Sequence, residues 1–173
     1  INPAWVTLEI TETMLMVGDN QNVKSVLDQL RSRGIRIALD DFGTGYSSLT
    51  HLRDFPIDRV KIDASFVRDI CTSVMSKNIV QAMVVMSRSL GIEVIAEGIE
   101  TEEQRRTLLE IGCYYGQGYL FSPAVPVDEA CALRFGYSDK ETAWPRAFPA
   151  VPAPGLPARQ CSRQTVPAAR LSK

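Results

Sequence analysis

The strongest constraint on the fold of this chain is a regular alternation of short β-rich runs with runs of helical period. The β-rich runs lie at residues 5–10, 35–40, 58–63, 92–97 and within 113–121. Between them, apolar residues recur at helical spacing, as in the run from Val23 to Leu30. Strands that alternate with helices pair in parallel through right-handed crossovers, so the sequence predicts an α/β fold with a parallel sheet.

Residues that commonly cap helices mark the ends of several expected helices. Asn20 can cap the first of these helices, and Gly34 can end it. Thr101 and Gln104 have the spacing of a capping box, which predicts a helix that ends at Gly112. Further helices are expected near Ser47, over residues 77–90 and over residues 128–134.

The number of strand–helix units leaves two architectures open. The chain has 173 residues, and about five units fall within its first 137 residues. A complete (β/α)8 barrel needs roughly 250 residues. The pattern therefore indicates either an open doubly wound sheet or one part of a barrel.

Composition divides the chain at about residue 137. Residues 1–137 carry 13 basic and 18 acidic side chains, whereas residues 138–173 carry 6 and 2, together with six of the ten prolines. No apolar periodicity occurs after residue 137, so that segment cannot bury a core. We expect one domain over 1–137 and a disordered basic tail over 138–173, which is either a solvated extension or a contact for an acidic partner.

Overall charge and hydropathy exclude some classes of partner. The net charge of −1 provides no global field that would favour a nucleic acid polymer. No run approaches the ~20 apolar residues of a membrane span, and the first residues show no export signal. The sequence therefore predicts a cytoplasmic protein without a membrane span in this chain.

Charged residues stand at the ends of nearly all the predicted strands. In a parallel sheet the carboxyl ends of the strands share one rim. That rim would gather six acids around Lys61, namely Glu9, Glu12, Asp40, Asp41, Asp63 and Glu97. Crowded carboxylates repel one another unless a cation joins them, and a donor set of oxygen alone favours Mg²⁺ or Mn²⁺. Single acids in such positions also serve as caps and turn residues, which is our interpretation of Asp54 and Asp58.

Five segments, in order, resemble the motifs of one known family. They are LEITET (8–13), ALDDFGTGYSSL (38–49), FPIDRVKIDASFV (55–67), AEGIET (96–101) and GQGYLF (116–121). These segments resemble the motifs of EAL domains, a family of bacterial cyclic-di-GMP phosphodiesterases. The resemblance implies a TIM-like barrel of which this chain is a part, with the site at its C-terminal rim.

The resemblance also implies a reaction and a role for each matching residue. The reaction is hydrolysis of cyclic-di-GMP to linear pGpG with Mg²⁺ or Mn²⁺, in a domain that in full length forms a homodimer. Glu9, Asp40 and Asp41 match metal ligands, Lys61 a lysine that orients the attacking water, and Glu97 the general base. Gln117, Asp63 and Glu100 match positions near substrate or water, and Glu12 matches the residue that anchors the loop carrying DDFGTGYSS.

Two family features do not occur in this sequence. The Glu-Ala-Leu motif and a metal-binding asparagine segment both precede the position of Ile1 in the family pattern, so the resemblance covers the C-terminal portion of the domain. We therefore expect an exposed sheet edge, weak stability and no turnover by this chain alone. The alternative is a non-catalytic module that binds cyclic-di-GMP or a protein partner.

Overall fold

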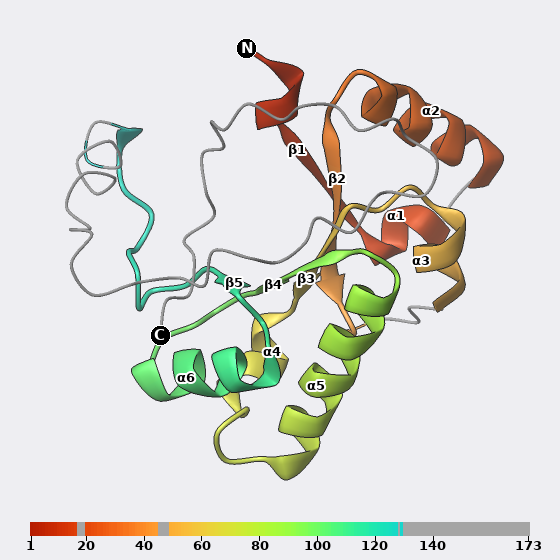
Figure 1. Ribbon diagram of the computed structural model, residues 1–173. Coiled ribbons are helices and arrows are strands. Elements are labelled where there is room, and N and C mark those ends of the chain that lie inside the picture. Colours follow the sequence, from red (N-terminus) through yellow and green to blue (C-terminus); the bar gives the residue numbers. More distant parts are fainter. Residues whose placement is uncertain (17–19, 45–48, 128, 130–173) are drawn as a thin grey trace.

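Five parallel strands form one sheet, and their order in space follows their order in the chain (Figure 1). The computed structural model describes residues 1–16, 20–44, 49–127 and 129. The strands are β1 (Thr7–Thr11), β2 (Arg36–Phe42), β3 (Arg59–Ile62), β4 (Glu93–Ala96) and β5 (Tyr115–Gly116). Each neighbouring pair is parallel, which confirms the predicted α/β class. The last strand is shorter than the run at 113–121 suggested.

Helices connect the strands, as the alternating pattern predicted. They are α1 (Glu12–Met16), α2 (Asn20–Ser32), α3 (Leu49–Asp54), α4 (Ala64–Arg68), α5 (Val74–Ser89) and α6 (Glu102–Ile111), and a 3-10 turn covers Pro3–Trp5. The capping box of Thr101 and Gln104 is present at the start of α6. The sequence missed α1 and α4, because five residues are too few to show a helical period. The expected helix at 128–134, except for Glu129, and the tail at 138–173 lie outside the described residues.

One face of the sheet packs against the helices and forms the core. Ile37, Leu39, Val60 and Ile62 are completely or almost completely buried, and every second residue of β2 and β3 belongs to this face. In Figure 1 the labelled helices lie to the right of and below the strands. Burial of these side chains, at about 25 cal/mol per Å² of apolar surface, is the main stabilising contribution.

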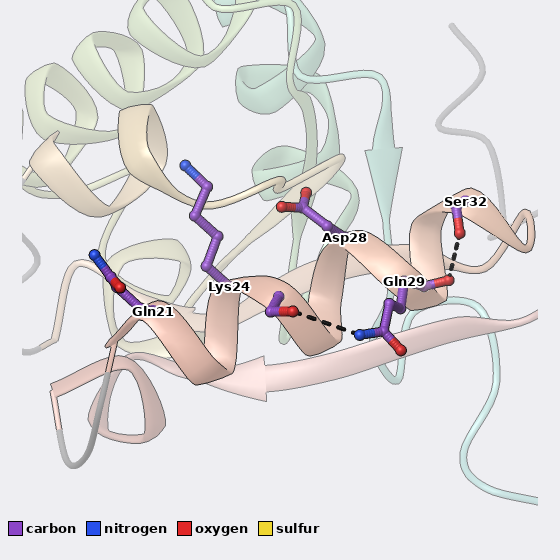
Figure 2. A pocket seen from close by; sticks show the side chains of 6 residues that line it. Gln21, Lys24, Asp28, Gln29 and Ser32 are labelled. Atoms are coloured by element: carbon purple, nitrogen blue, oxygen red, sulfur yellow. Dashed lines mark hydrogen bonds between the residues drawn. The ribbon is translucent and has the colours of Figure 1, made fainter.

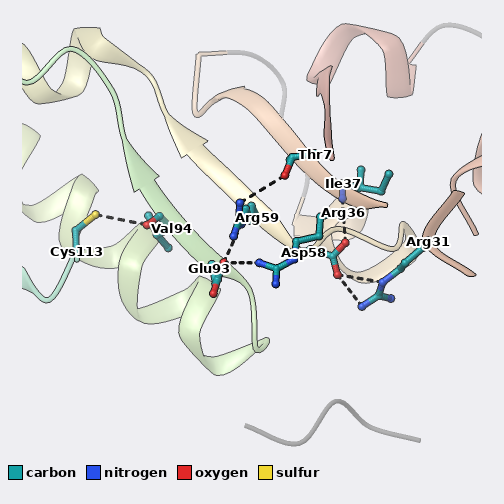
Figure 3. A network of polar contacts seen from close by, with 9 residues as sticks. All are labelled: Thr7, Arg31, Arg36, Ile37, Asp58, Arg59, Glu93, Val94 and Cys113. Atoms are coloured by element: carbon teal, nitrogen blue, oxygen red, sulfur yellow. Dashed lines mark hydrogen bonds and ion pairs between the residues drawn. The ribbon is translucent and has the colours of Figure 1, made fainter. Parts of the chain in front are cut away.

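The opposite face of the sheet is mostly polar, with the buried Ala38 and Ile95 among its charged residues, which an open sheet with one solvated face or the interior of a barrel both allow. At the amino ends of the strands, Arg59 Nε donates to Glu93 Oε2 at 2.8 Å, and Arg36 lies 3.8 Å from the same carboxylate (Figure 3). Arg59 also reaches Thr7 Oγ1 at 3.5 Å. This network joins β1, β2, β3 and β4 across the polar face.

Asp58 has a structural role at the start of β3. Its carboxylate accepts a hydrogen bond from the backbone N–H of Ile37 at 2.9 Å and pairs with Arg31 at 2.9 Å (Figure 3). Asp58 thus ties β3 to β2 and to the end of α2, in keeping with its interpretation as a turn residue.

None of the helices in the described residues has both the length and the hydropathy that crossing a membrane requires.

Candidate functional site

Lys61 lies at the centre of an acidic cluster that draws on four strands. Its side chain projects from β3 and is only 5% exposed. Its Nζ lies 2.9 Å from Glu9 of β1, 3.0 Å from Asp40 of β2 and 2.9 Å from Glu97, which follows β4. The register explains the meeting, because Thr11 pairs with Asp40, and Lys61 pairs with Ile95, near the carboxyl ends of their strands. The structure therefore brings these four predicted site residues together.

A bulge in β2 brings the carboxylates of two consecutive residues, Asp40 and Asp41, close together. Successive side chains of a regular strand point to opposite faces. Here the register between β2 and β3 shifts between Leu39 and Phe42, and Asp41 has a φ of 55°. Such a φ is costly for a residue other than glycine, and strain of this kind concentrates at functional sites. As a result, Asp40 and Asp41 both turn toward Glu97.

Asp40, Asp41 and Glu97 form the group best placed to hold a cation. Each offers one carboxylate oxygen, and these oxygens all lie within 4.8 Å of one another. Glu9, which the resemblance matched to a metal ligand, is not in this group and instead contacts Lys61. All donors are carboxylate oxygens, so the residues present fit a hard divalent ion such as Mg²⁺ or Mn²⁺.

The cluster perturbs the ionisation of its own members. Burial alone would lower the pKa of Lys61, but the hydrogen bonds that its ammonium donates to Glu9, Glu97 and Asp40 outweigh burial and raise that pKa above its ordinary value. Burial raises the pKa of Glu97, and repulsion from Asp40 and Glu9 adds to the rise, while Lys61 opposes it. A bound divalent cation would relieve this repulsion, which is the electrostatic reason to expect one here.

Gln117 contacts the cluster from the loop after β5. Its side-chain Nε2 donates a hydrogen bond to Glu97 Oε1. Lys61 Nζ contacts the same oxygen. Gln117 therefore lies against the acidic cluster, and its match to a position near substrate or water stays a prediction.

The carboxylates of Asp63 and Glu100 do not contact the cluster in the part of the chain that the structure describes. Asp63 is the N-cap of α4, and its Oδ1 accepts a hydrogen bond from the backbone N–H of Ser65 at 2.9 Å. Glu100 is exposed in the loop before α6, where its backbone N–H donates to Gln104 Oε1 at 2.8 Å. Their matches to substrate-binding or water-binding positions stay predictions.

We expect the substitution Asp63→Ala to lower the free energy of unfolding at pH 7 by about 1 kcal/mol, because α4 loses its cap. The hydrogen bond with Ser65 lowers the pKa of Asp63 below its usual 3.8. A carboxylate with a lowered pKa stabilises the fold above its ordinary pKa and loses that effect as the pH falls. The difference should therefore be full at pH 7 and should shrink below about pH 4 in urea titrations. Asp28→Ala, at an exposed position of α2, is the control; an equal loss in both variants would contradict the capping role.

Glu12 connects α1 to the loop after β2. It is buried, and its Oε1 accepts a hydrogen bond from the backbone N–H of Gly43 at 3.1 Å. Gly43 has a φ of 100°, and a Cβ there would lie 2.3 Å from Met83 Cε and 3.0 Å from Phe66. The loop that begins with Asp40 and Asp41 is thus confined by α1, α4 and α5. The sequence suggested Glu12 but gave no reason to single out Phe66 or Met83.

A hollow on the outer surface of the molecule lies apart from this cluster. Its lining residues all come from α2: Gln21, Lys24, Ser25, Asp28, Gln29 and Ser32 (Figure 2). Its hydrogen bonds are local to the helix, such as Ser32 Oγ to the carbonyl oxygen of Gln29 at 2.7 Å. A polar surface formed by one helix gives no reason to expect a bound ligand, so the cluster around Lys61 is the candidate site.

Comparison with known proteins identifies the architecture to which the five strands belong. The EAL domain family matches residues 1–124. The solved structure of the EAL enzyme Bd1971 with cAMP and cyclic-di-GMP bound superposes with a TM-score of 0.73 and 41% identity, and the match covers 77% of this chain and 35% of that one. The five-stranded sheet is thus part of the TIM-like barrel of EAL domains, as the resemblance predicted.

Two further proteins of this family are similar to the chain over most of its length. Cyclic di-GMP phosphodiesterase NbdA of Pseudomonas aeruginosa is 44% identical over 123 residues, which are 71% of this chain and 16% of NbdA. BlrP1 of Klebsiella pneumoniae, solved with manganese and cyclic-di-GMP, is 41% identical with a TM-score of 0.67, and the match covers 71% of this chain and 31% of that one. The chain thus spans less than a third of the length of the curated relatives it matches.

Proposed function

Because this chain belongs to the EAL domain family, we propose that its acidic cluster is part of the active site of a metal-dependent phosphodiesterase that hydrolyses cyclic-di-GMP to linear pGpG. The observation that carries the proposal is the convergence of Glu9, Asp40 and Glu97 on Lys61. A cluster built only to stabilise the fold would not need a strained Asp41 beside it. NbdA is a cyclic di-GMP phosphodiesterase and BlrP1 was solved with manganese and cyclic-di-GMP, which supports this substrate class and a divalent metal.

In this proposal Asp40 and Asp41, with Glu9 as a further ligand, would hold Mg²⁺ or Mn²⁺, and Glu97 lies beside the ion as the base. A divalent cation at such a site would lower the pKa of bound water from its bulk value toward neutrality. The chain's own contribution is to fix the oxygen donors before the ion arrives. The bulge of β2 and the hydrogen bond between the N–H of Asp41 and Asp40 Oδ1, at 3.1 Å, serve that purpose.

Lys61 acts as a fixed positive charge. Its raised pKa keeps the ammonium protonated at neutral pH, so it can orient the attacking water and stabilise the negative charge that develops on the phosphate. Its almost complete burial makes the charge more effective, because water screens it little. A phosphodiester that enters the rim would meet this charge between the carboxylates of β1, β2 and β4.

Glu97 acts as the general base. Its pKa is raised toward the pH at which proton transfer is efficient, while Lys61 keeps it available as a carboxylate. Gln117 holds one of its oxygens through the amide. Asp63 and Glu100 are proposed to contact substrate or water, and Glu12 to position the loop that carries the two aspartates.

The test is hydrolysis of cyclic-di-GMP in the presence of Mg²⁺ by two proteins. One is this chain alone, and the other is a hybrid in which the preceding strands of an EAL domain are joined before Ile1. We expect turnover by the hybrid only, because the sheet of the described residues has an open edge at β1, where Glu9 is half exposed. An Asp28→Asn hybrid, changed on the outer surface of α2, should match the unaltered hybrid.

Two outcomes would contradict this proposal. Turnover by the chain alone would show that its activity does not depend on further strands. A folded hybrid that binds cyclic-di-GMP without hydrolysing it would indicate a binding module instead of an enzyme.

A further inference from the structure

The loop after β4 and the loop after β5 meet backbone to backbone beside the candidate site. The N–H of Ile99 donates to the carbonyl oxygen of Gln117 at 3.1 Å, and the N–H of Leu120 donates to the carbonyl oxygen of Ile99 at 2.9 Å. The N–H of Gln117 also donates to the carbonyl oxygen of Ala96 at 2.9 Å. The backbone of Gln117 is therefore fixed through both its N–H and its carbonyl oxygen.

Gly118 allows these bonds to form. A Cβ at Gly118 would lie 2.2 Å from the carbonyl oxygen of Ile99 and 2.3 Å from its nitrogen. Real Cβ atoms do not approach backbone atoms so closely, so any larger residue must push the two loops apart. We call this contact between Gly118 and the Ile99 backbone the Gly118–Ile99 clasp.

The loop on the other side of the clasp cannot easily move away. Ile99 is completely buried, and the next two backbone N–H groups, of Glu100 and Thr101, donate to Gln104 Oε1 at 2.8 and 3.0 Å. The residue before it, Gly98, lies so close to α4 that a Cβ there would be 2.5 Å from the Cβ of Ala64. A Cβ at Gly118 would consequently displace the loop that carries Gln117.

The position of Gln117 decides how Glu97 is held. Lys61 and Gln117 both contact Glu97 Oε1. Within the described residues, the hydrogen bond from Gln117 and the short contact with Lys61 both go to Oε1, and no hydrogen bond is made by Glu97 Oε2. The two donors thus fix the carboxylate through one oxygen and leave the other to accept a proton or to bind a cation.

From this geometry we infer that Gly118 is a positioning residue of the site, acting through the Gly118–Ile99 clasp to hold the Gln117 amide as a donor to Glu97. The structural part of the inference depends only on the contacts above, and its catalytic part rests on the proposed function. The inference predicts that Gly118 and Gln117 behave as one unit, so that loss of either has the same consequence for Glu97.

The first experiment uses NMR on the ¹⁵N-labelled chain without metal. In the unaltered chain, one side-chain amide proton of Gln117 should resonate downfield of those of the exposed Gln81 and exchange more slowly with water. In Gly118→Ala both features should disappear, although Gln117 is still present. Gly91→Ala is the matched control, because Gly91 also has a positive φ but a Cβ there meets nothing within 4 Å.

Retention of the Gln117 signature in a folded Gly118→Ala variant would overturn the inference. If that variant does not fold, the unaltered chain still decides the question. The backbone N–H groups of Ile99 and Leu120 should then be protected from exchange as well as those of β4, and exchange at the rate of an open loop would overturn the clasp.

The second experiment measures kcat in the EAL hybrid. Gly118→Ala and Gln117→Ala should each lower kcat about tenfold, as expected for the loss of a hydrogen bond to a charged group. The double variant should be no slower than the slower single variant, and multiplied losses would overturn the inference. Absence of hydrolysis by the unaltered hybrid would count against the proposed function, while the NMR result would still test the clasp.

Discussion

Replacing Lys61 with methionine is expected to lower the free energy of unfolding at pH 7 by about 3 kcal/mol, because it leaves buried carboxylates without their cation. Methionine keeps the length of the side chain, so the loss reports charge and not a cavity. The side chains of Asp40 and Glu97 are only 24% and 15% exposed, so water compensates them poorly. Guanidinium denaturation of both proteins measures the difference.

The pH dependence distinguishes this explanation from a general packing defect. In the unaltered protein the pKa of Lys61 is raised, so its contribution is complete below its ordinary pKa of 10.5 and is lost only as the pH rises above that value. In Lys61→Met, the pKa of Glu97 would rise further, because Lys61 is the group that opposes its rise. Protonation of Glu97 then favours the folded state, so the deficit should shrink between pH 7 and pH 5.

Lys77→Met provides the matched control for this prediction. Lys77 forms an exposed pair with Glu110 at 3.9 Å, and such pairs contribute about 1 kcal/mol or less. Equal losses in the two variants, or a deficit in Lys61→Met that stays constant with pH, would contradict the assigned role of Lys61. Added Mg²⁺ should also reduce the deficit, because the cation replaces the missing positive charge.

The substitution Asp40→Asn is expected to weaken binding of Mn²⁺ by at least about 100-fold, because even outer residues of metal sites contribute 10–100-fold. Asp40 is the residue that both contacts Lys61 and belongs to the group of three carboxylates. The asparagine oxygen can still accept a hydrogen bond from Lys61, so the fold should persist. Calorimetric titration of the chain with Mn²⁺ measures the affinity.

Two other variants test whether the loss of Mn²⁺ affinity is specific to the cation site. Asp41→Asn should weaken the same binding, because Asp41 offers a carboxylate oxygen to the group. Asp28→Asn removes one negative charge from the exposed face of α2 and should leave the affinity unchanged (Figure 2). Affinities for Asp40→Asn and Asp28→Asn that agree within error would contradict a cation site between Asp40, Asp41 and Glu97.

Much of the fold could be read from local patterns. The strand–helix alternation predicted the parallel sheet, and Thr101 with Gln104 marked the start of α6, because capping depends on neighbouring residues alone. The sharing of one rim by strand ends predicted that Glu9, Asp40 and Glu97 would meet. That inference succeeded because sheet polarity fixes where the end of each strand lies.

Other features of the site had no signal in the sequence. Asp63 follows β3 in the same way that Glu97 follows β4, yet Asp63 caps α4 while Glu97 contacts Lys61. The direction of each side chain depends on the turn that follows it, and a list of acids at strand ends does not contain that information. Gly118 also had no signal beyond lying in the predicted β-rich run at 113–121, because the backbone of Ile99 reaches it only after the two loops pack.

The amino-acid sequence by itself determined the alternation of strands with the longer helices, the motifs of the EAL family and the end of the sheet at which the acids collect, because these follow from periodicity, capping chemistry and chain direction. Only the tertiary structure decided which carboxylates contact Lys61, how the bulge turns Asp41 beside Asp40, and how Gly118 holds Gln117 against Glu97. These contacts join residues far apart in the chain at distances near 3 Å, and such distances are set by packing between elements.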